Sequence, residues 1–175
     1  MRTLSFLGAA LTAIMARAAC GDSKDEVAPG PTSAFGTPGP NVTQAANIPC
    51  EATEKLTYHV HSRLTIHINN QRAPVPAEVG IRNTCIFWLH THDAGGVIHV
   101  EAPSKRSFTL GQFFQVWGQP LSRTALLNNK TDAQHEISAF VSGRLVTGDP
   151  AAIPLEDNAD IVLMYGPPFP ASPAP

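Results

Sequence analysis

Six of the seven histidines of this chain lie in two short stretches, and their spacing suits metal binding. Residues i and i+2 of a β-strand project from the same face, about 7 Å apart, so each His-x-His motif presents two imidazoles to one side. Imidazole nitrogens are strong ligands for divalent transition metals. The two stretches hold, in chain order, His59, His61 and His67, and then His90, His92 and His99.

A hairpin predicted around residues 93–96 aligns the second stretch. The sequence Asp-Ala-Gly-Gly is typical of a tight turn, and apolar segments flank it on both sides. With this loop His90 pairs with His99, while His92 takes the next position on the same face. Glu101 follows on that face too. Three imidazoles and a carboxylate should therefore share one surface.

We expect five metal ligands if the first stretch packs beside this hairpin: His59, His61, His90, His92 and His99. Glu101 would be an outer ligand or a hydrogen-bond partner that fixes a histidine tautomer. Asp93 suits a ligand and a turn residue equally well. His67 stands at the far end of its strand, where a surface or supporting role is expected, and the isolated His135 is expected to be simply polar.

The donor types favour copper or zinc, with iron as a further candidate, because calcium and magnesium prefer oxygen ligands. Met164 is the only methionine outside the N-terminal segment, which disfavours a thioether-rich copper(I) site.

The main hypothesis is a metal-binding protein that buffers, delivers or senses the ion. The alternative is a metalloenzyme with an open three-histidine site and Glu101 or Asp93 as general base, acting by zinc-water hydration or hydrolysis or by copper or iron oxygen chemistry. A third reading is an envelope module whose histidines only decorate its surface.

Two short motifs resemble those of known families. His59-Val60-His61 resembles the copper-binding His-Val-His of copper-zinc superoxide dismutases, and His90-Thr91-His92 is similar to the His-x-His of cupins. The first resemblance covers three residues, without the later zinc-binding loop, and the second lacks the cupin glutamate. Neither implies that the family's activity is present here. Serine hydrolase and nucleotide chemistry are disfavoured, since no Gly-x-Ser-x-Gly or phosphate-binding glycine loop occurs.

The elements that must position these residues are mostly strands. Residues 56–68 alternate with period two, and residues 84–92 and 97–101 read as the two strands of the hairpin around 93–96. Residues 136–147 read as a further hairpin, and residues 161–165 form a continuous apolar strand. Thr109 is the expected N-cap of a short helix through Trp117, with its aromatic stripe in the core. This order predicts an α+β, β-rich fold: a small mixed or antiparallel sheet with one short helix packed on it, in a β-grasp-like arrangement. An all-β sandwich is the alternative.

The two ends of the chain have other compositions. Residues 1–20 read as an export signal, with Cys20 as a candidate lipid attachment site of a lipoprotein, although an ordinary signal cleavage is also compatible. Residues 21–47 read as a disordered tether, 48–168 as the histidine-rich metal-binding domain and 169–175 as a loose tail. The protein is therefore expected in the cell envelope, lipid-anchored or else periplasmic or extracellular.

Cys50 and Cys85 are expected to form a disulfide, because exported chains fold in oxidising compartments. A thiolate metal ligand is the alternative.

The formal net charge is −2 and the 12 Lys and Arg are scattered, which argues against nucleic acid or an anionic membrane as an electrostatic partner. Membrane contact is expected only through a lipid on Cys20, and no protein partner can be read.

Overall fold

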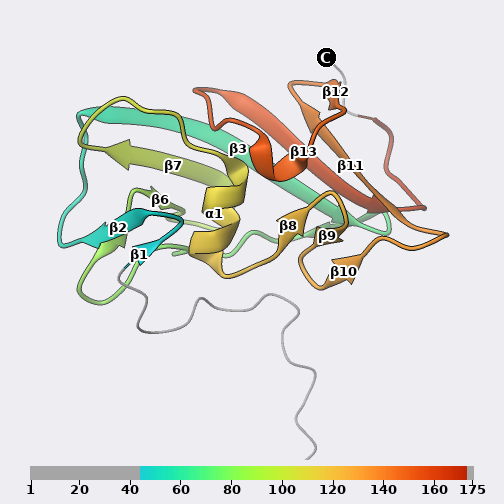
Figure 1. Cartoon of the computed structure of the whole chain (residues 1–175), viewed down its shortest axis with the longest axis horizontal. Coiled ribbons are helices and arrows are strands. Elements are labelled where there is room, and N and C mark those ends of the chain that lie inside the picture. The colour runs from blue at the N-terminus through green and yellow to red at the C-terminus, as the bar shows by residue number, and fades with distance from the viewer. Residues whose placement is uncertain (1–43, 173–175) are drawn as a thin grey trace, which may run out of the picture. The chain divides into compact units, whose positions relative to one another are not determined.

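Strand β3 (Tyr58–Ile68) is the centre of a mixed seven-stranded sheet in the computed structural model, which describes residues 44–172, and it is the longest strand in that range (Figure 1). The strands run in the order β12-β11-β13-β3-β7-β6, and β4 pairs with β3 beyond the end of β7. Strand β13 is parallel to β3, and every other pair in this sheet is antiparallel. The remaining strands are β4 (Gln71–Ala73), β6 (Leu89–His90), β7 (Val97–Ala102), β11 (Glu136–Val141), β12 (Arg144–Val146) and β13 (Ala159–Gly166).

The period-two pattern of β3 decides which face of this sheet meets the core. Leu64 and Ile66 are buried in the apolar cluster, whereas His59 and Arg63, of the other parity, are exposed. Strand β7 repeats the pattern, with Ile98 buried in the same cluster. Burial of one parity fixes the register of the strands, because a slip of one residue would place apolar side chains in water. The polar parity, which carries the histidines, therefore occupies the opposite face.

Helix α1 (Leu110–Trp117) packs on the apolar face, in front of the sheet in Figure 1. It begins at Thr109, whose side chain accepts a hydrogen bond from the backbone of Gln112, and it ends at Gly118 in the left-handed conformation. Its apolar stripe is fully buried, as the sequence predicts for a core helix: Leu110, Phe113, Phe114 and Trp117.

Two small three-stranded sheets complete the fold. One consists of β1 (Gln44–Ala45), β2 (Ile48–Glu51) and β5 (Ile86–Phe87), and the other of β8 (Leu121–Ser122), β9 (Ala125–Leu126) and β10 (Asn129–Lys130). A short 3-10 helix, η1 (Pro150–Ala152), precedes β13. Strand β1 lies within the segment that the sequence assigns to a tether, and it pairs with β2.

A disulfide joins Cys50 on β2 to Cys85, the residue before β5. This bond confirms the predicted pairing, and it leaves neither sulfur free to act as a thiolate ligand. Strands β2 and β5 are also paired directly, with Cys50 opposite Phe87. The segment that follows Cys50 is thereby fixed beside the chain that leads to His90.

The α+β, β-rich class is confirmed, with one short helix on a mixed sheet in place of the all-β sandwich. One predicted strand is interrupted, however. Residues 84–92 form two short strands on either side of Trp88, because Phe87 pairs with Cys50 in one sheet and Leu89 pairs with Val100 in another. Among residues 44–172 no helix is long and apolar enough to cross a bilayer. The predicted export signal and Cys20 lie outside the described residues.

Candidate metal centre

Three histidines form a row across three neighbouring strands. His99 on β7 is directly opposite His61 on β3, and on its other side it is directly opposite His90 on β6. Directly opposed residues in an antiparallel pair have Cβ atoms about 5 Å apart, so their rings can meet. The Nε2 atom of His61 lies 3.1 Å from Nδ1 of His99. The pairing of His90 with His99 is the one that the predicted hairpin loop requires.

A second row adds His59 and Glu101, which are opposite each other on β3 and β7. The Glu101 carboxylate points back into the first row. Its Oε1 atom lies 3.2 Å from Nε2 of His59, 3.5 Å from Nδ1 of His99 and 3.8 Å from Nε2 of His90. Ligand atoms about 2.0–2.1 Å from a tetrahedral ion are about 3.3–3.4 Å apart, so these separations are close to those of a coordination shell.

His92 joins the cluster from the loop after β6 and not from a strand. Its Nε2 atom lies 3.2 Å from Nε2 of His90. The sequence predicted that the strand would continue through His92, but Thr91 turns away from β7. Its backbone N–H donates to the carbonyl of Val79, and its hydroxyl donates to the carbonyl of Pro76. Those bonds replace the ladder with β7 and leave the His92 ring beside the end of the row.

The clustered donors divide into two overlapping groups, within each of which the candidate ligand atoms lie within 4.8 Å of one another. We call the first the inner group; it comprises His90, His92, His99 and Glu101. We call the second the outer group; it comprises His59, His61 and His99. All five histidines expected as ligands thus belong to one group or the other, and His99 belongs to both.

The cluster is buried at its base and open at its rim. The His90 side chain has 0% of its surface exposed and that of Glu101 has 4%, whereas His59 and His92 have 38% and 47%. Burial, together with the neighbouring imidazoles, lowers the pKa of His90 to about 4 and that of His99 to about 4. Both rings are therefore neutral at neutral pH, which is the form that binds metal.

The buried His90 ring is held in one orientation by a backbone contact. Its Nδ1 atom lies 2.9 Å from the carbonyl oxygen of Phe87. Since a carbonyl only accepts hydrogen bonds, this contact assigns the proton to Nδ1 and leaves the lone pair on Nε2. The lone pair is directed toward His92 and Glu101, as in metal sites where a second-sphere carbonyl fixes the ligand tautomer.

The Glu101 carboxylate lacks a permanent cationic partner. Its ion-pair partners within 4 Å are the three imidazoles already named, and among residues 44–172 no Lys or Arg pairs with it. Its second oxygen, Oε2, is buried without a hydrogen-bond partner. Burial, and after it the nearby Glu54 carboxylate, raises the pKa of Glu101. A buried carboxylate is costly unless it is paired or neutralised, and a bound cation would neutralise this one.

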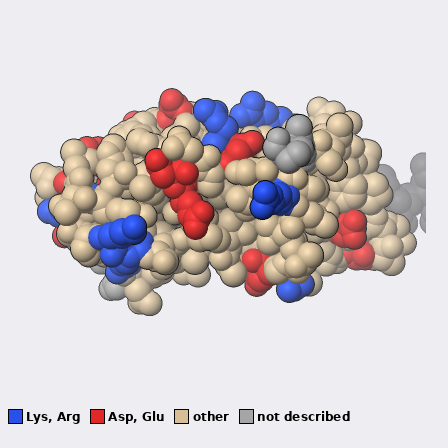
Figure 2. Space-filling model, turned by 90° about the horizontal axis from the view of Figure 1, so that it is seen from above, with Lys and Arg blue, Asp and Glu red and all other residues tan. Residues whose placement is uncertain are grey.

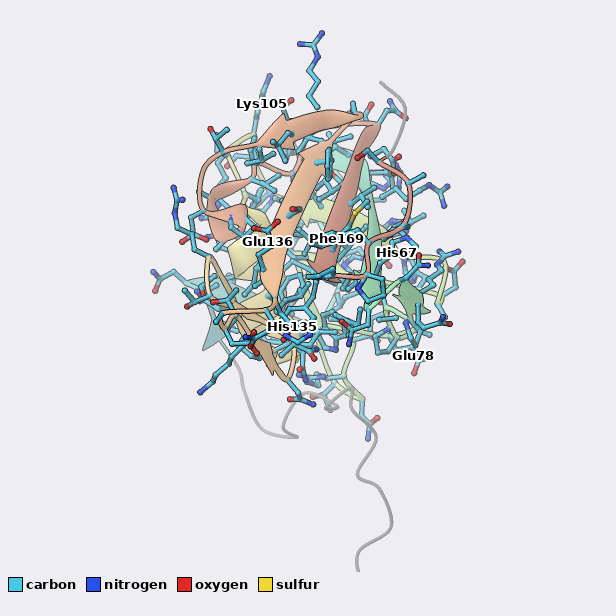
Figure 3. The ribbon with its side chains drawn as sticks, turned by 90° about the vertical axis from the view of Figure 1, so that its right-hand side faces the viewer. His67, Glu78, Lys105, His135, Glu136 and Phe169 are labelled. Carbon is cyan, nitrogen blue, oxygen red and sulfur yellow. A yellow bond between two sulfur atoms is a disulfide. The ribbon has the colours of Figure 1, made fainter. Side chains whose placement is uncertain are left out.

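Two of the secondary candidates lie outside both groups. The Asp93 carboxylate accepts a hydrogen bond from the backbone N–H of Gly95 at 2.7 Å, as a turn-forming aspartate does. His67 is opposite Arg72 and Met164 at the far end of β3, about 20 Å along the strand from His61. Figure 3 labels His67 on β3, and His135, whose Nδ1 atom contacts Asp132 Oδ1 at 2.9 Å.

Glu54 is a neighbour of the site that the sequence did not indicate. One of its carboxylate oxygens lies 3.9 Å from Nε2 of His92. The residue sits in a loop without periodicity, so only the disulfide offered a signal. A bond from Cys50 to Cys85 brings the residues after Cys50 close to those before His90, and acidic residues in that segment are then candidate neighbours of the histidines.

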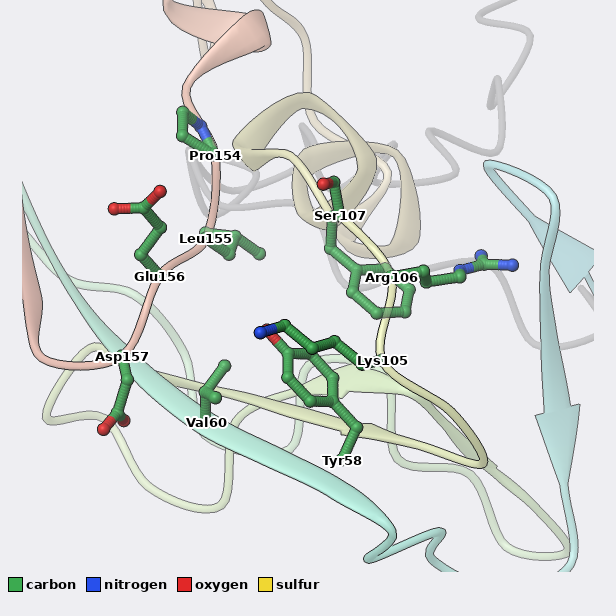
Figure 4. A pocket seen from close by; sticks show the side chains of 10 residues that line it. Tyr58, Val60, Lys105, Arg106, Ser107, Pro154, Leu155, Glu156 and Asp157 are labelled. Carbon is green, nitrogen blue, oxygen red and sulfur yellow. The ribbon is translucent and has the colours of Figure 1, made fainter.

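Two hollows are lined in part by residues of β3. The larger, about 440 Å³, is lined by Tyr58 and Val60, whose parity is opposite to that of the histidines (Figure 4). Figure 4 shows Glu156 and Asp157 on one side of it and Lys105 across from them. A smaller hollow of about 170 Å³ is lined by His61 itself, together with residues of β3, β7 and β13. Of these two hollows, only the smaller is lined by a residue of the histidine cluster.

Charge on the surface is mixed in sign. On the face shown in Figure 2, Lys and Arg are interspersed with Asp and Glu, and neither sign covers a continuous area.

Comparison of the chain with protein-family models, curated proteins and solved structures gives no match.

Proposed function

We propose that this chain is an exported protein that binds a transition metal ion, copper or zinc, through the histidine cluster. The observation that carries the proposal is the Glu101 carboxylate, which is buried among three imidazole nitrogens with one oxygen unpartnered. The neutral His90 and His99 rings supply no charge to offset it. A divalent cation would supply that charge and would use the nitrogen lone pairs at the same time.

The donor set favours borderline metals. Several imidazoles and one carboxylate suit Zn²⁺, Cu²⁺ and Fe²⁺, whereas Ca²⁺ and Mg²⁺ need more oxygen ligands. Affinities for such sites usually rise toward Cu²⁺ and fall again at Zn²⁺. Copper is therefore expected to bind most tightly in a direct competition, with zinc next and iron weaker.

The open rim supports a role in buffering, delivery or sensing of the ion. His59 and His92 are each more than one third exposed, so an incoming chelator or partner protein has access to two of the ligands. The Cys50–Cys85 disulfide supports an oxidising, extracytoplasmic compartment. The same proposal divides the chain into four parts: residues 1–20 as export signal with Cys20 as lipid attachment site, 21–47 as tether, 48–168 as metal-binding domain and 169–175 as tail.

A metalloenzyme is the second candidate, and the hollow beside His61 favours it. Three histidines can hold zinc with a fourth position open to water, whose pKa the metal lowers to about 7. Hydrolysis of an activated ester by the zinc-loaded protein, or consumption of superoxide by the copper-loaded protein, tests this role. If Glu101→Gln lowers the turnover rate by a larger factor than it lowers the metal content, catalysis is favoured. If the wild type turns over neither substrate, only the binding role remains.

The deciding experiment for binding is metal titration of the full chain, purified without an affinity tag and stripped with a chelator. We expect Cu²⁺ and Zn²⁺ to bind, Glu101→Gln to weaken binding at least tenfold, and His135→Ala to bind as the wild type does. His135 is a matched control because it lies outside both groups. Absence of binding in the wild type, or equal loss in the His135 variant, would contradict the proposal.

A further inference from the structure

The two ligand groups share His99, and their arrangement on the sheet separates the others. The inner group takes His90 from β6, and the outer group takes His61 from β3, with β7 between them. Strands two positions apart in a sheet lie about 9.5 Å from each other. Rings anchored on β3 and β6 lean toward β7 from opposite sides, so the six clustered donors do not all fit around one point.

We propose that the cluster holds two metal ions, one in each group. This inference rests on the proposed metal-binding function and specifies the stoichiometry and the two sites. The inner site would use His90, His92, His99 and Glu101, four donors that complete a tetrahedral shell. The outer site would use His59 and His61 with a donor shared from β7, and it keeps a position open to solvent.

Glu101 on β7 is suited to serve both ions. A carboxylate carries two oxygens and can bridge a pair of metals, whereas His99, as a neutral imidazole, would bind one ion only. Glu101 Oε1 is 3.2 Å from His59 Nε2 in the outer group and 3.8 Å from His90 Nε2 in the inner group. Its Oε2 atom is buried and unpartnered. The carboxylate thus faces both groups and has a free oxygen to offer.

Charge predicts that the two ions bind unequally. Glu101 is the only carboxylate in either group, and Glu54 approaches the rim at 3.9 Å from His92. Two divalent cations at a typical dinuclear separation of about 3.5–4 Å repel each other strongly when so few negative charges lie between them. The inner site, with its own carboxylate and greater burial, should fill first. The outer site should fill later, with weaker affinity and faster exchange.

The test is the number of Zn²⁺ and of Cu²⁺ ions bound per chain, measured by calorimetric titration and elemental analysis of the full, untagged protein. We expect two ions in two steps. His61→Ala should bind one ion and keep the tight step, whereas His92→Ala should lose the tight step. His135→Ala is the control, and circular dichroism with a thiol assay checks that each variant retains its fold and disulfide.

Each alternative result has a distinct meaning. If the wild type binds one ion and His61→Ala and His92→Ala weaken that same step, the two-ion inference is wrong and the proposed metal-binding function stands. If the wild type binds no ion, both are wrong. If it binds two ions but neither variant lowers the count, the ions occupy other residues and the two-ion assignment is again wrong.

Discussion

Lowering the pH should destabilise the metal-free domain, because the folded domain buries imidazoles that stay neutral while the same groups take up protons in the unfolded chain. The pKa of His90 falls from 6.5 to about 4, chiefly through burial. The unfolded chain then takes up a proton near pH 6.5 while the folded chain does not. Stability from this residue is fully present above pH 6.5 and is lost as the pH falls toward 4.

The expected size follows from that shift. For a pKa of 6.5 in the unfolded chain and about 4 in the folded chain, linkage gives a loss of about 2.5 kcal/mol at pH 4.5 from His90 alone. His99, whose pKa is also about 4, adds a loss of the same sign. Glu101 acts in the opposite direction, because its raised pKa favours the folded state as the pH falls. The His90 contribution must therefore be isolated by a variant.

His90→Asn provides that isolation. An asparagine amide can still donate a hydrogen bond toward the Phe87 carbonyl, but it does not titrate. We would measure the free energy of unfolding by urea denaturation in chelator at several pH values between 7.5 and 4.5. The wild type should lose about 2.5 kcal/mol more than the variant over that range. Equal losses in the wild type and in His90→Asn would refute the reasoning.

Three further predictions concern the disulfide, the cap of helix α1 and stabilisation by zinc. The Cys50–Cys85 disulfide closes a loop with a sequence separation of 35 residues. Its reduction should lower the free energy of unfolding, measured by urea denaturation, by about 4 kcal/mol, and a loss below about 1 kcal/mol would contradict this. Thr109→Ala removes the N-cap of α1 and should cost about 1 kcal/mol by the same assay without changing metal uptake; altered uptake would show that the helix end influences the site. Zn²⁺ at about 100 times its dissociation constant should add about 2.7 kcal/mol to the free energy of unfolding of the wild type, which is measured as a rise in melting temperature. The same rise in Glu101→Gln at equal zinc concentration would contradict the role given to Glu101.

The local parts of the site were predictable from the sequence. The turn at residues 93–96 fixes the register of a hairpin, and that register places His90 opposite His99. Period two in β3 and β7 then assigns the histidines and Glu101 to the face away from the core. The Thr109 cap and the Gly118 end of α1 were equally local signals.

The long-range parts could not be predicted in the same way. The parallel pairing of β3 with β13, and the choice of β7 as the antiparallel neighbour of β3, depend on contacts between segments far apart in the chain. No local pattern specifies them. The departure of His92 from the strand depends on Thr91 bonding to Val79 and Pro76, and these bonds carry no sequence signature. Glu54 reaches His92 only because the chain folds back after the disulfide.

The most direct measurement is X-ray diffraction from crystals of the protein grown with Zn²⁺, with data collected on both sides of the zinc absorption edge. An anomalous peak is expected about 2.0–2.2 Å from Nε2 of His90, a ring nitrogen of His99 and an oxygen of Glu101. Anomalous density that appears only elsewhere, for example at His135 and Asp132, or none at saturating zinc, would contradict the assignment of this cluster as a metal centre.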